Sequence, residues 1–439
     1  MIKLKLHWQI LIALLAAIIF GTIIRTFELQ DTGFGGGLVA VCVFIGKLFM
    51  NALKMIVVPL IVSSIIVGIM SLGSDKDFGR MGLKVLVYYS LTGFLAIVTG
   101  LILVNTIKPG VVDMELAQQI LGQAETSQDF IEKFEGRGTS ELVNIFLRMV
   151  PPNIIKAATD NGQLLGLITF SLLFGFFIGK LPEKLRSFQS NFWESIQQVM
   201  MHITDLIIKF APIGVFGLVT PILIRTGFAA FKPLLLFFMT ILIALGFHTF
   251  VTLGLLLKFI GHIKPFAHFK TMSPALLTAF STASSASTLP VTMETVQKEA
   301  GVSSRISSFT LPLGATVNMD GTALYECVVV IFIGQIYGVL QGFEIGFVTQ
   351  FTVLLLALLT SVGVAGIPAA SLVAITVILG VVGLPLEAVG LIWVTDRVLD
   401  MCRTSVNVYS DTCGAVIIGR TEGETGIYPE DGVEAGSPA

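Results

Sequence analysis

The chain has 439 residues, of which 54% are hydrophobic and only 13% are charged, and its mean hydropathy is +0.88. Soluble proteins carry roughly 25% charged residues, so this composition excludes an ordinary soluble domain and predicts an all-α polytopic membrane protein surrounded by lipids. The formal net charge of −2 gives no reason to expect a nucleic-acid partner. We expect the multi-pass chain to lie in a prokaryotic plasma membrane.

Eight stretches of the chain are apolar over about 20 residues or more, the length that crosses a bilayer. The first follows Lys3 and Lys5 and has no small-residue cleavage motif, so it predicts a retained helix with the N-terminus inside. Basic residues gather in three of the connections and acidic residues in 108–141, which places the former in the cytoplasm and the latter outside. The eight transmembrane helices are expected at 8–25, 40–71, 79–106, 141–179, 192–219, 229–257, 303–337 and 384–418.

Two further apolar segments are interrupted in the middle. STASSASTLP (281–290) lies within 264–299, and TSVGVAGIPA (360–369) lies within 341–380. Non-helical backbone at membrane depth is tolerated only where it is buried in protein or lines a cavity, so each segment is predicted as a re-entrant helical hairpin. Such a pair of broken segments indicates inverted repeats with a substrate site near the membrane midplane. For each segment alone, a packing surface of small residues is the alternative.

The last span carries a polar stripe. Asp396, Asp400, Arg403, Asn407 and Asp411 fall within an arc of about 80° if the segment is helical, because each residue turns the helix by roughly 100°. A charge at the bilayer centre costs about 2.5 to 3.5 kcal/mol, so these side chains are expected to face a binding site. The alternative is a set of internal ion pairs that only hold helices together. Three acids against one base favour the binding of cations.

A third motif, PLGATVNMDGTALYE, covers residues 312–326. Gly314, Asn318 and Asp320 lie around Gly321, which is expected to let the helix unwind and to expose carbonyl oxygens beside a carboxylate. A hard cation such as sodium needs several oxygen ligands, at least one of them charged. The motif therefore predicts a sodium site.

The remaining reactive side chains give little sign of catalysis. The five histidines are not paired in the sequence with serine or carboxylate residues, and there is no phosphate-binding loop, so we do not expect an enzyme. A channel is the other class to be tested against a carrier. The cysteines lie in apolar stretches without metal-ligand spacing and are expected to be packing residues; they are Cys42, Cys327, Cys402 and Cys413.

Four motifs taken together resemble the dicarboxylate/amino acid:cation symporter family, which includes the archaeal aspartate transporters and the excitatory amino acid transporters. They are STASSASTLP, NMDGTALYE, GVAGIPA and LDMCRTSVNVYSD, and their order and spacing match through essentially the whole chain. The resemblance implies a homotrimer and an elevator-type mechanism, in which a transport domain moves against a scaffold. The implied parts are scaffold helices 1 and 2 (1–72), transport-domain helix 3 (73–107), an extracellular acidic loop (108–139), scaffold helices 4 and 5 (140–224), the rest of the transport domain with both hairpins (225–420) and a disordered cytoplasmic tail (421–439).

The resemblance implies sodium-coupled import of acidic amino acids, L-aspartate or L-glutamate. Arg403 would hold the side-chain carboxylate, Asp400 the ammonium and Asn407 the α-carboxylate, in keeping with the bidentate fit of guanidinium to carboxylate. Asp396 would orient Arg403. The other implied pocket residues are Thr322, Thr404, Ser285 in the first hairpin and Ile367 in the second.

The family also implies three sodium sites. The first two share Asn318, and the third would form from backbone carbonyls only when the second hairpin closes. The ligands carried over are Gly314, Asn318, Asn407 and Asp411 for the first site, Tyr89, Thr92, Asn318 and Asp320 for the second, and Thr316, Ser361, Val362 and Val364 for the third.

The chain departs from its relatives near these sites. Gly93 stands where a hydroxyl residue is usual, so the site of Tyr89 loses a ligand. Ala283 and Met401 stand where many members carry a second arginine. Arg403 is therefore expected to be the only strong cation in the pocket.

Glu326 matches a glutamate that the excitatory transporters link to proton or potassium movement, whereas archaeal members have an amide there. Protons are therefore a second candidate coupling ion, and a packing role is the alternative. Other substrates also stay open, among them a C4-dicarboxylate, cystine or a neutral amino acid. Asp400 argues against the dicarboxylate and Arg403 against the neutral amino acid, because each would be left without its partner. The sodium ligands argue against coupling to protons alone.

Overall fold

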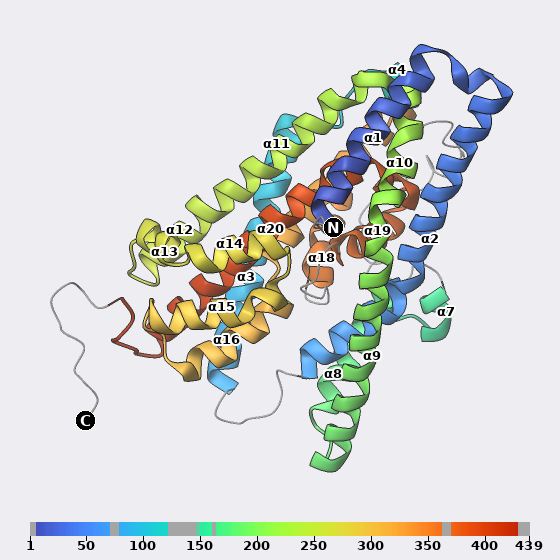
Figure 1. Cartoon of the computed structure of the whole chain (residues 1–439). Coiled ribbons are helices and arrows are strands. Elements are labelled where there is room, and N and C mark those ends of the chain that lie inside the picture. Colours follow the sequence, from blue (N-terminus) through green and yellow to red (C-terminus); the bar gives the residue numbers. More distant parts are fainter. Residues whose placement is uncertain are drawn as a thin grey trace, which may run out of the picture.

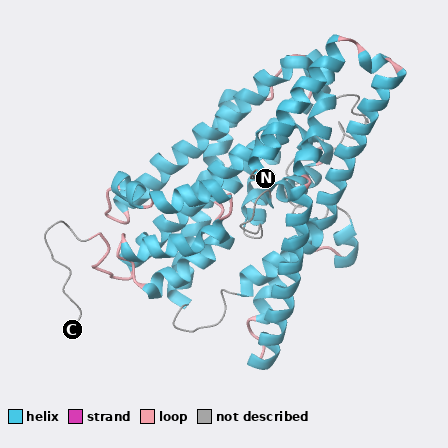
Figure 2. Ribbon diagram, in the orientation of Figure 1, coloured by secondary structure: helices cyan, strands magenta, loops and turns pink. Residues whose placement is uncertain are grey.

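The computed structural model describes residues 6–70, 79–121, 147, 149–159, 164–361 and 370–428. Within these residues every regular element is a helix (Figure 2), which confirms the predicted all-α class. Six helical stretches in the described part are long and apolar enough to cross a membrane, compared with the eight that the sequence predicts. The six are Trp8–Thr26, Gly33–Ala52, Arg80–Ile107, Ala211–Ala229, Phe231–Phe259 and Ser304–Gln341.

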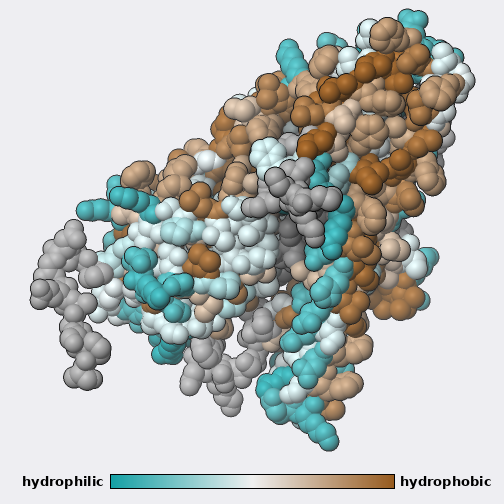
Figure 3. Space-filling model, viewed as in Figure 1, coloured by the Kyte–Doolittle hydropathy of each residue, from teal (hydrophilic) through white to brown (hydrophobic). Residues whose placement is uncertain are grey.

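One group of helices is formed by α1 (Leu6–Thr26), α2 (Gly33–Met70), α7 (Ile154–Thr159), α8 (Leu164–Ile178), α9 (Glu183–Lys209) and α10 (Ala211–Thr226). α2 packs against α8, α9 and α10, and α1 packs against α10. α9 and α10 follow each other end to end on the right of Figure 1, and α2 runs beside both. Figure 3 shows hydrophobic side chains over α1, α2 and α10 and a hydrophilic strip along α9. This group therefore presents a broad apolar surface to its surroundings.

A second group surrounds α17 (Asp320–Gln341) and α20 (Trp393–Thr421). α17 packs against α3, α18, α19 and α20, and α20 packs against α14, α15 and α16. The majority of these helices lie on the left of Figure 1. The other members are α3 (Gly79–Ile107), α4 (Met114–Leu121), α11 (Phe231–Phe247), α12 (Leu253–Phe259), α13 (Pro265–Thr271), α14 (Ser273–Thr282), α15 (Ser285–Lys298), α16 (Ser304–Val317), α18 (Phe347–Ser361) and α19 (Ala370–Val382).

Short turns join or interrupt these helices. The segment between α11 and α12 is a π-helical turn, η5, so the predicted span 229–257 is helical but not regular. The 3-10 turns are η1 (Leu29–Asp31), η4 (Gly227–Ala230) and η6 (Leu386–Leu391).

The prediction of one helix over 192–219 is wrong. α9 ends at Lys209 and α10 starts at Ala211, with Pro212 in its first turn. Proline has no N–H to donate and its fixed φ suits the first turn of a helix, so a new helix begins there. α9 also starts nine residues earlier than predicted, at Glu183, and its early turns carry charged residues that apolarity alone does not detect.

The first predicted hairpin is present. α14 and α15 pack against each other and are separated by only Ala283, which is left-handed with φ 50°, and Ser284. The Ser284 side chain accepts a hydrogen bond from the N–H of Ser287 and so caps α15. The break is shorter than the predicted 281–290, because Pro290 lies within α15.

The second predicted hairpin is described only in its arms. α18 packs against α19, and both are apolar. Its tip lies outside the described residues, and so do Val362, Val364 and Ile367. Their predicted contacts with sodium and substrate stay predictions.

The chain after α20 does not begin as a disordered tail. Residues 421–428, here called the C-terminal segment, fold back onto the second group. Glu422 pairs with Arg80 at 2.8 Å and with Lys84 at 2.5 Å, and hydrogen bonds from Lys84 and Arg80 lower the pKa of its carboxyl below the usual range. Tyr428 lies 2.9 Å from His268 Nδ1 through its hydroxyl. The acidic composition predicted disorder from residue 421, and the individual contacts that order 421–428 leave no pattern in the sequence. Residues 429–439 lie outside the described part.

Candidate functional site

The polar stripe lies on a single helix, as predicted. α20 contains all five side chains, and each is at most 4% exposed. α14, α15, α16 and α17 all pack against this helix, so the stripe faces a protein interior and not lipid. The five residues are Asp396, Asp400, Arg403, Asn407 and Asp411.

Arg403 is held between two carboxylates. Its Nη1 lies 3.0 Å from Asp396 Oδ1, and its Nη2 lies 2.8 Å from Asp400 Oδ1. The guanidinium carbon stacks 4.1 Å from the ring centre of Tyr325, and the Tyr325 hydroxyl donates to Asp396 Oδ1 at 2.7 Å. Asp396 and Tyr325 therefore both contact the guanidinium or its partner and restrict its orientation. A planar guanidinium fixed in this way is suited to bind a carboxylate.

A second arginine also reaches this cluster. Arg397 Nη1 lies 3.2 Å from Asp400 Oδ2, so the prediction that Arg403 is the only strong cation in the pocket is wrong. Arg397 lies outside the 80° stripe, but its side chain is long enough to bend towards Asp400 three residues along the helix. The spacing of three residues between oppositely charged side chains was the available signal.

Asn407 connects α20 to the start of α17. Its Oδ1 accepts hydrogen bonds from the N–H groups of Gly321 at 2.7 Å and Thr322 at 3.3 Å, and its Nδ2 donates to Thr322 Oγ1 at 3.0 Å. The first N–H groups of a helix have no partner within it, so an amide oxygen from another helix satisfies them. Asn407 and Thr322 therefore lie together.

The break in the NMDGT motif lies two residues before its glycine. α16 ends at Val317 and α17 begins at Asp320, so Asn318 and Met319 are the unwound residues. Gly321 lies inside α17, and a Cβ there would lie 2.5 Å from the carbonyl oxygen of Arg403. The glycine is thus required for close approach of the two helices, and not for unwinding as predicted.

Asn318 brings the predicted sodium ligands together. Its Nδ2 donates to Asp411 Oδ1 at 2.9 Å and to Ser410 Oγ at 3.0 Å, and its Oδ1 accepts from Thr92 Oγ1 at 3.3 Å. Ser410 in turn donates to Asp320 Oδ2 at 2.6 Å. Neither Asp320 nor Asp411 has a lysine or arginine partner among the described residues. Two buried carboxylates without a lysine or arginine partner fit cations, because an isolated buried charge is costly.

Gly314 and Tyr89 border the same cluster. A Cβ on Gly314 would lie 2.4 Å from Asp411 Oδ1 and 2.8 Å from the Tyr89 hydroxyl. Tyr89 donates its hydroxyl to the carbonyl of Thr310 at 2.8 Å. The structure therefore brings Tyr89, Gly314 and Asp411 within contact of one another.

We expect Gly314→Ala to raise the sodium concentration required for half-maximal substrate binding by about tenfold or more. The added methyl must displace the Asp411 carboxylate, and overpacking of this kind costs about 1 to 3 kcal/mol. Gly246→Ala in α11 is the matched control, because no atom outside its own helix lies within 4 Å of the new Cβ. Sodium titrations of both purified variants check the prediction, and equal sodium requirements would contradict it.

The other predicted residues are placed as follows. Glu326 is fully buried, its Oε2 accepts from Thr360 Oγ1 at 2.9 Å, and its Oε1 has no hydrogen-bond partner within the described residues. Ser285 is buried at the start of α15, which packs against α20. The remaining hydroxyls donate to backbone carbonyls of their own helices, namely Thr404 to Asp400, Thr316 to Leu313 and Ser361 to Leu358.

His248 was missed by the sequence reasoning. It lies in η5, is fully buried, and its Nε2 is 3.0 Å from Asp320 Oδ2. The expectation that no histidine pairs with a carboxylate is therefore wrong. The only signal was a single histidine within an apolar span, which more often marks a packing residue.

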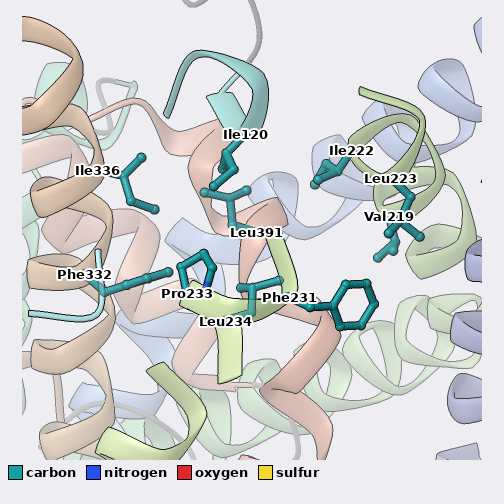
Figure 4. Close-up of a pocket in the computed structure, with 10 residues that line it drawn as sticks. All are labelled: Ile120, Val219, Ile222, Leu223, Phe231, Pro233, Leu234, Phe332, Ile336 and Leu391. Carbon is teal, nitrogen blue, oxygen red and sulfur yellow. The ribbon is translucent and has the colours of Figure 1, made fainter. Parts of the chain in front are cut away.

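One apolar cavity lies apart from Arg403, which does not line it. The cavity in Figure 4 lies among α4, α10, α11, α17 and η6 and is lined by apolar residues such as Leu223, Phe231 and Phe332. Arg403 itself is 1% exposed, with its charge paired to Asp396 and Asp400. In this structure the charge of Arg403 is therefore neutralised within the protein.

The whole chain is similar to known transport proteins. It is 34% identical over 424 residues to the proton/sodium-glutamate symport protein of Geobacillus stearothermophilus, which covers 96% of each chain. It is 32% identical over 423 residues to the proton/glutamate-aspartate symporter of Escherichia coli (strain K12), covering 96% of this chain and 94% of that one. It is 33% identical over 454 residues to excitatory amino acid transporter 3 of Mus musculus, covering 94% and 86%. The family model of the sodium:dicarboxylate symporters matches residues 6–421, and the chain belongs to the sodium:dicarboxylate symporter family.

Proposed function

We propose that this multi-pass membrane protein imports L-aspartate or L-glutamate by sodium-coupled symport. The observation that carries the proposal is the division of the buried stripe on α20. One end holds Arg403 between Asp396 and Asp400, and the other end places Asp411 beside Asn318 without a basic partner among the described residues. The first arrangement suits a zwitterion with an extra carboxylate, and the second suits a cation. The relatives named for glutamate or aspartate symport support the same substrate class.

Substrate recognition would exchange internal ion pairs for substrate contacts. The side-chain carboxylate would take the place of Asp400 on Arg403, and the released Asp400 would bind the ammonium. Asn407 would turn an N–H towards the α-carboxylate, and Thr322 would contribute its hydroxyl. Asp396 and Tyr325 would keep the guanidinium in place during this exchange. The energy of the exchange is small because each charge keeps an opposite partner before and after binding.

Sodium would bind where protein oxygens gather without a lysine or arginine among the described residues. The first site would use Asp411, Asn318 and the backbone of Gly314, and the second would use Asp320 and Thr92. Both sites share Asn318, so ion occupancy and the geometry of the break between α16 and α17 depend on each other. The implied third site depends on the second hairpin, whose tip lies outside the described residues.

Transport would proceed by an elevator motion within a homotrimer. The division of the helices into two packing groups supports a scaffold of α1, α2 and α7 to α10 and a moving unit built on α3 and α11 to α20. The substrate and ion residues that the structure describes lie in the second group. A rigid-body displacement of that unit would carry the closed site across the membrane and give alternating access.

Uptake into proteoliposomes tests the proposal. Radiolabelled aspartate and glutamate should accumulate against their gradients only when sodium is imposed outside, and not with choline. Uptake of succinate, cystine or alanine in preference to the acidic amino acids would overturn the substrate assignment. A sodium gradient that moves no substrate uphill would favour a channel.

Glu326 supports protons as a second coupling ion. It is buried near the pocket, and its Oε1 has no hydrogen-bond partner among the described residues. The relative from Geobacillus stearothermophilus carries both proton and sodium in its name. A carboxyl group in this place would gain or lose a proton as the pocket empties and fills.

If Glu326 carries a proton, uptake should rise when the outside is acidified, and Glu326→Gln should abolish that pH dependence while keeping sodium-dependent binding. Reversal potentials at two pH values measure the charge moved. A cycle with three sodium ions and one acidic amino acid would carry about two charges, or about 4.6 kcal/mol per 100 mV, and protons would raise that count. Glu194→Gln on the exposed face of α9 is the control. An unchanged pH response in Glu326→Gln would return Glu326 to a packing role.

A further inference from the structure

The side chain of His248 makes its contact with Asp320 from an irregular turn. η5 (His248–Thr252) interrupts α11 and α12 with a π-helical turn, a distortion that occurs frequently at functional sites. Both His248 and Asp320 are 0% exposed. His248 Nδ1 has no hydrogen-bond partner within the described residues, so the contact of Nε2 with Asp320 Oδ2 is the one polar contact found there for this ring.

The two oxygens of Asp320 have different surroundings. Oδ2 lies 3.0 Å from His248 Nε2 and 2.6 Å from Ser410 Oγ. Oδ1 is buried and has no hydrogen-bond partner in the described part of the chain. A carboxylate oxygen left bare in this way costs free energy unless a ligand takes it up. The asymmetry leaves Oδ1 available for a cation and gives Oδ2 to the protein.

Gly93 makes the orientation of Asp320 depend on these two donors. A Cβ at Gly93 would lie 3.5 Å from Asp320 Oδ1, so a hydroxyl residue there would contact that oxygen directly. The chain has no side chain at this position. Among the described residues, the carboxylate is consequently held only through its Oδ2, by hydrogen bonds with His248 and Ser410.

We propose that His248 is a positioning residue for the coupling cation: its Nε2–H donates to Asp320 Oδ2 and so directs Oδ1 to the ion beside Thr92. The inference rests on the proposed function, because it assigns a role within the second sodium site. The carboxylate accepts the hydrogen bond, so the ring carries its proton on Nε2. A side chain that replaces His248 must therefore place a hydrogen-bond donor at the same distance from the backbone as Nε2.

Two amide variants separate this role from packing. The side-chain nitrogen of His248→Gln reaches the position of Nε2, whereas that of His248→Asn is one bond too short. Sodium alone is the probe: the rise in thermal unfolding temperature of the purified full-length protein is titrated with sodium chloride against choline chloride, without substrate. We expect His248→Asn to need about tenfold more sodium than wild type, and His248→Gln to stay within about threefold, because a lost hydrogen bond to a buried charge weakens the site by this order.

A control variant in the same turn and a double variant with Asp320 complete the test. Thr249→Val removes a hydroxyl of the same turn that donates to the carbonyl of Leu245, and it should leave the sodium requirement unchanged. In an Asp320→Asn background, His248→Asn should add no further loss, since the two act as one unit. Aspartate affinity at saturating sodium should stay within about twofold in both amide variants.

Three outcomes would overturn the inference. They are a His248→Asn protein with the sodium requirement of wild type, a His248→Gln protein as impaired as His248→Asn, and a loss from His248→Asn that persists in full beside Asp320→Asn. If wild type itself showed no stabilisation and no uptake specific to sodium, the proposed function would fail first, before any comparison of variants.

Discussion

Arg403→Ala is expected to lower the affinity for aspartate and glutamate by about a hundredfold or more. Arg403 is 1% exposed and pairs with Asp396 and Asp400, so its removal leaves two buried carboxylates facing the position of the substrate carboxylate. Breaking a buried pair by removal of one partner costs about 3 to 5 kcal/mol, and each 1.4 kcal/mol is about tenfold in affinity. Calorimetric titration with both amino acids at saturating sodium measures the loss.

Lysine should not rescue Arg403. An ammonium group cannot make the two parallel contacts of a guanidinium, and it would lose the stacking on Tyr325. Arg305→Ala is the matched control, because this arginine is exposed on α16 and its loss removes a cation without touching the pocket. Affinities in Arg403→Ala within about threefold of wild type would show that the pocket is assigned wrongly. If Arg397 replaced it on the substrate, the double variant with Arg397→Ala would lose the remaining affinity.

Asp411→Asn is expected to weaken the sodium dependence and to preserve selection for an acidic substrate. The carboxylate is 3% exposed and accepts from Asn318, and no lysine or arginine contacts it in the described part of the chain. The amide keeps the shape but loses the charge that a cation requires, so the sodium concentration for half-maximal binding should rise about tenfold or more, in line with about 1.5 to 3 kcal/mol for interactions with a charged group.

The decisive plot for Asp411→Asn is substrate affinity against sodium concentration. Its slope should fall, because one ion is no longer taken up with the substrate, while discrimination against neutral amino acids by Arg403 continues. Asp205→Asn removes a carboxylate from the exposed face of α9 and should leave the slope unchanged. An identical slope for Asp411→Asn and wild type would remove this carboxylate from the ion site.

The parts of the site that follow from helical periodicity were predictable. Spacings of four and three residues define one face of a helix, and α20 places its five polar residues on that face. The expectation that Asn318, Asp320 and Asp411 lie near one another came from the family resemblance. In the structure, Asn318 contacts Asp411 directly, and Ser410 links Asn318 to Asp320. In contrast, Arg397 reaches Asp400 through a flexible side chain whose direction depends on tertiary contacts. The spacing of three residues allows this pairing but does not by itself decide it.

His248 and the C-terminal segment were unpredictable for a different reason. The partner of His248 is 72 residues away, and the segment after α20 contacts residues as distant as Arg80. Isolated contacts between single residues far apart in the chain leave no local pattern. The break at Asn318 and Met319 was located only to within a few residues because glycine is used here for close helix packing.

The contacts of the C-terminal segment fix its position relative to the second group of helices. Glu422 ties it to the start of α3, and Tyr428 ties it to α13 through His268. Thr425 is exposed between these two anchors, and Ser187 is exposed on α9 in the other group. Fluorophores can be attached to cysteines introduced at these two positions in a protein that lacks its four native cysteines. Single-molecule energy transfer between them would then report the distance between the two helix groups during transport.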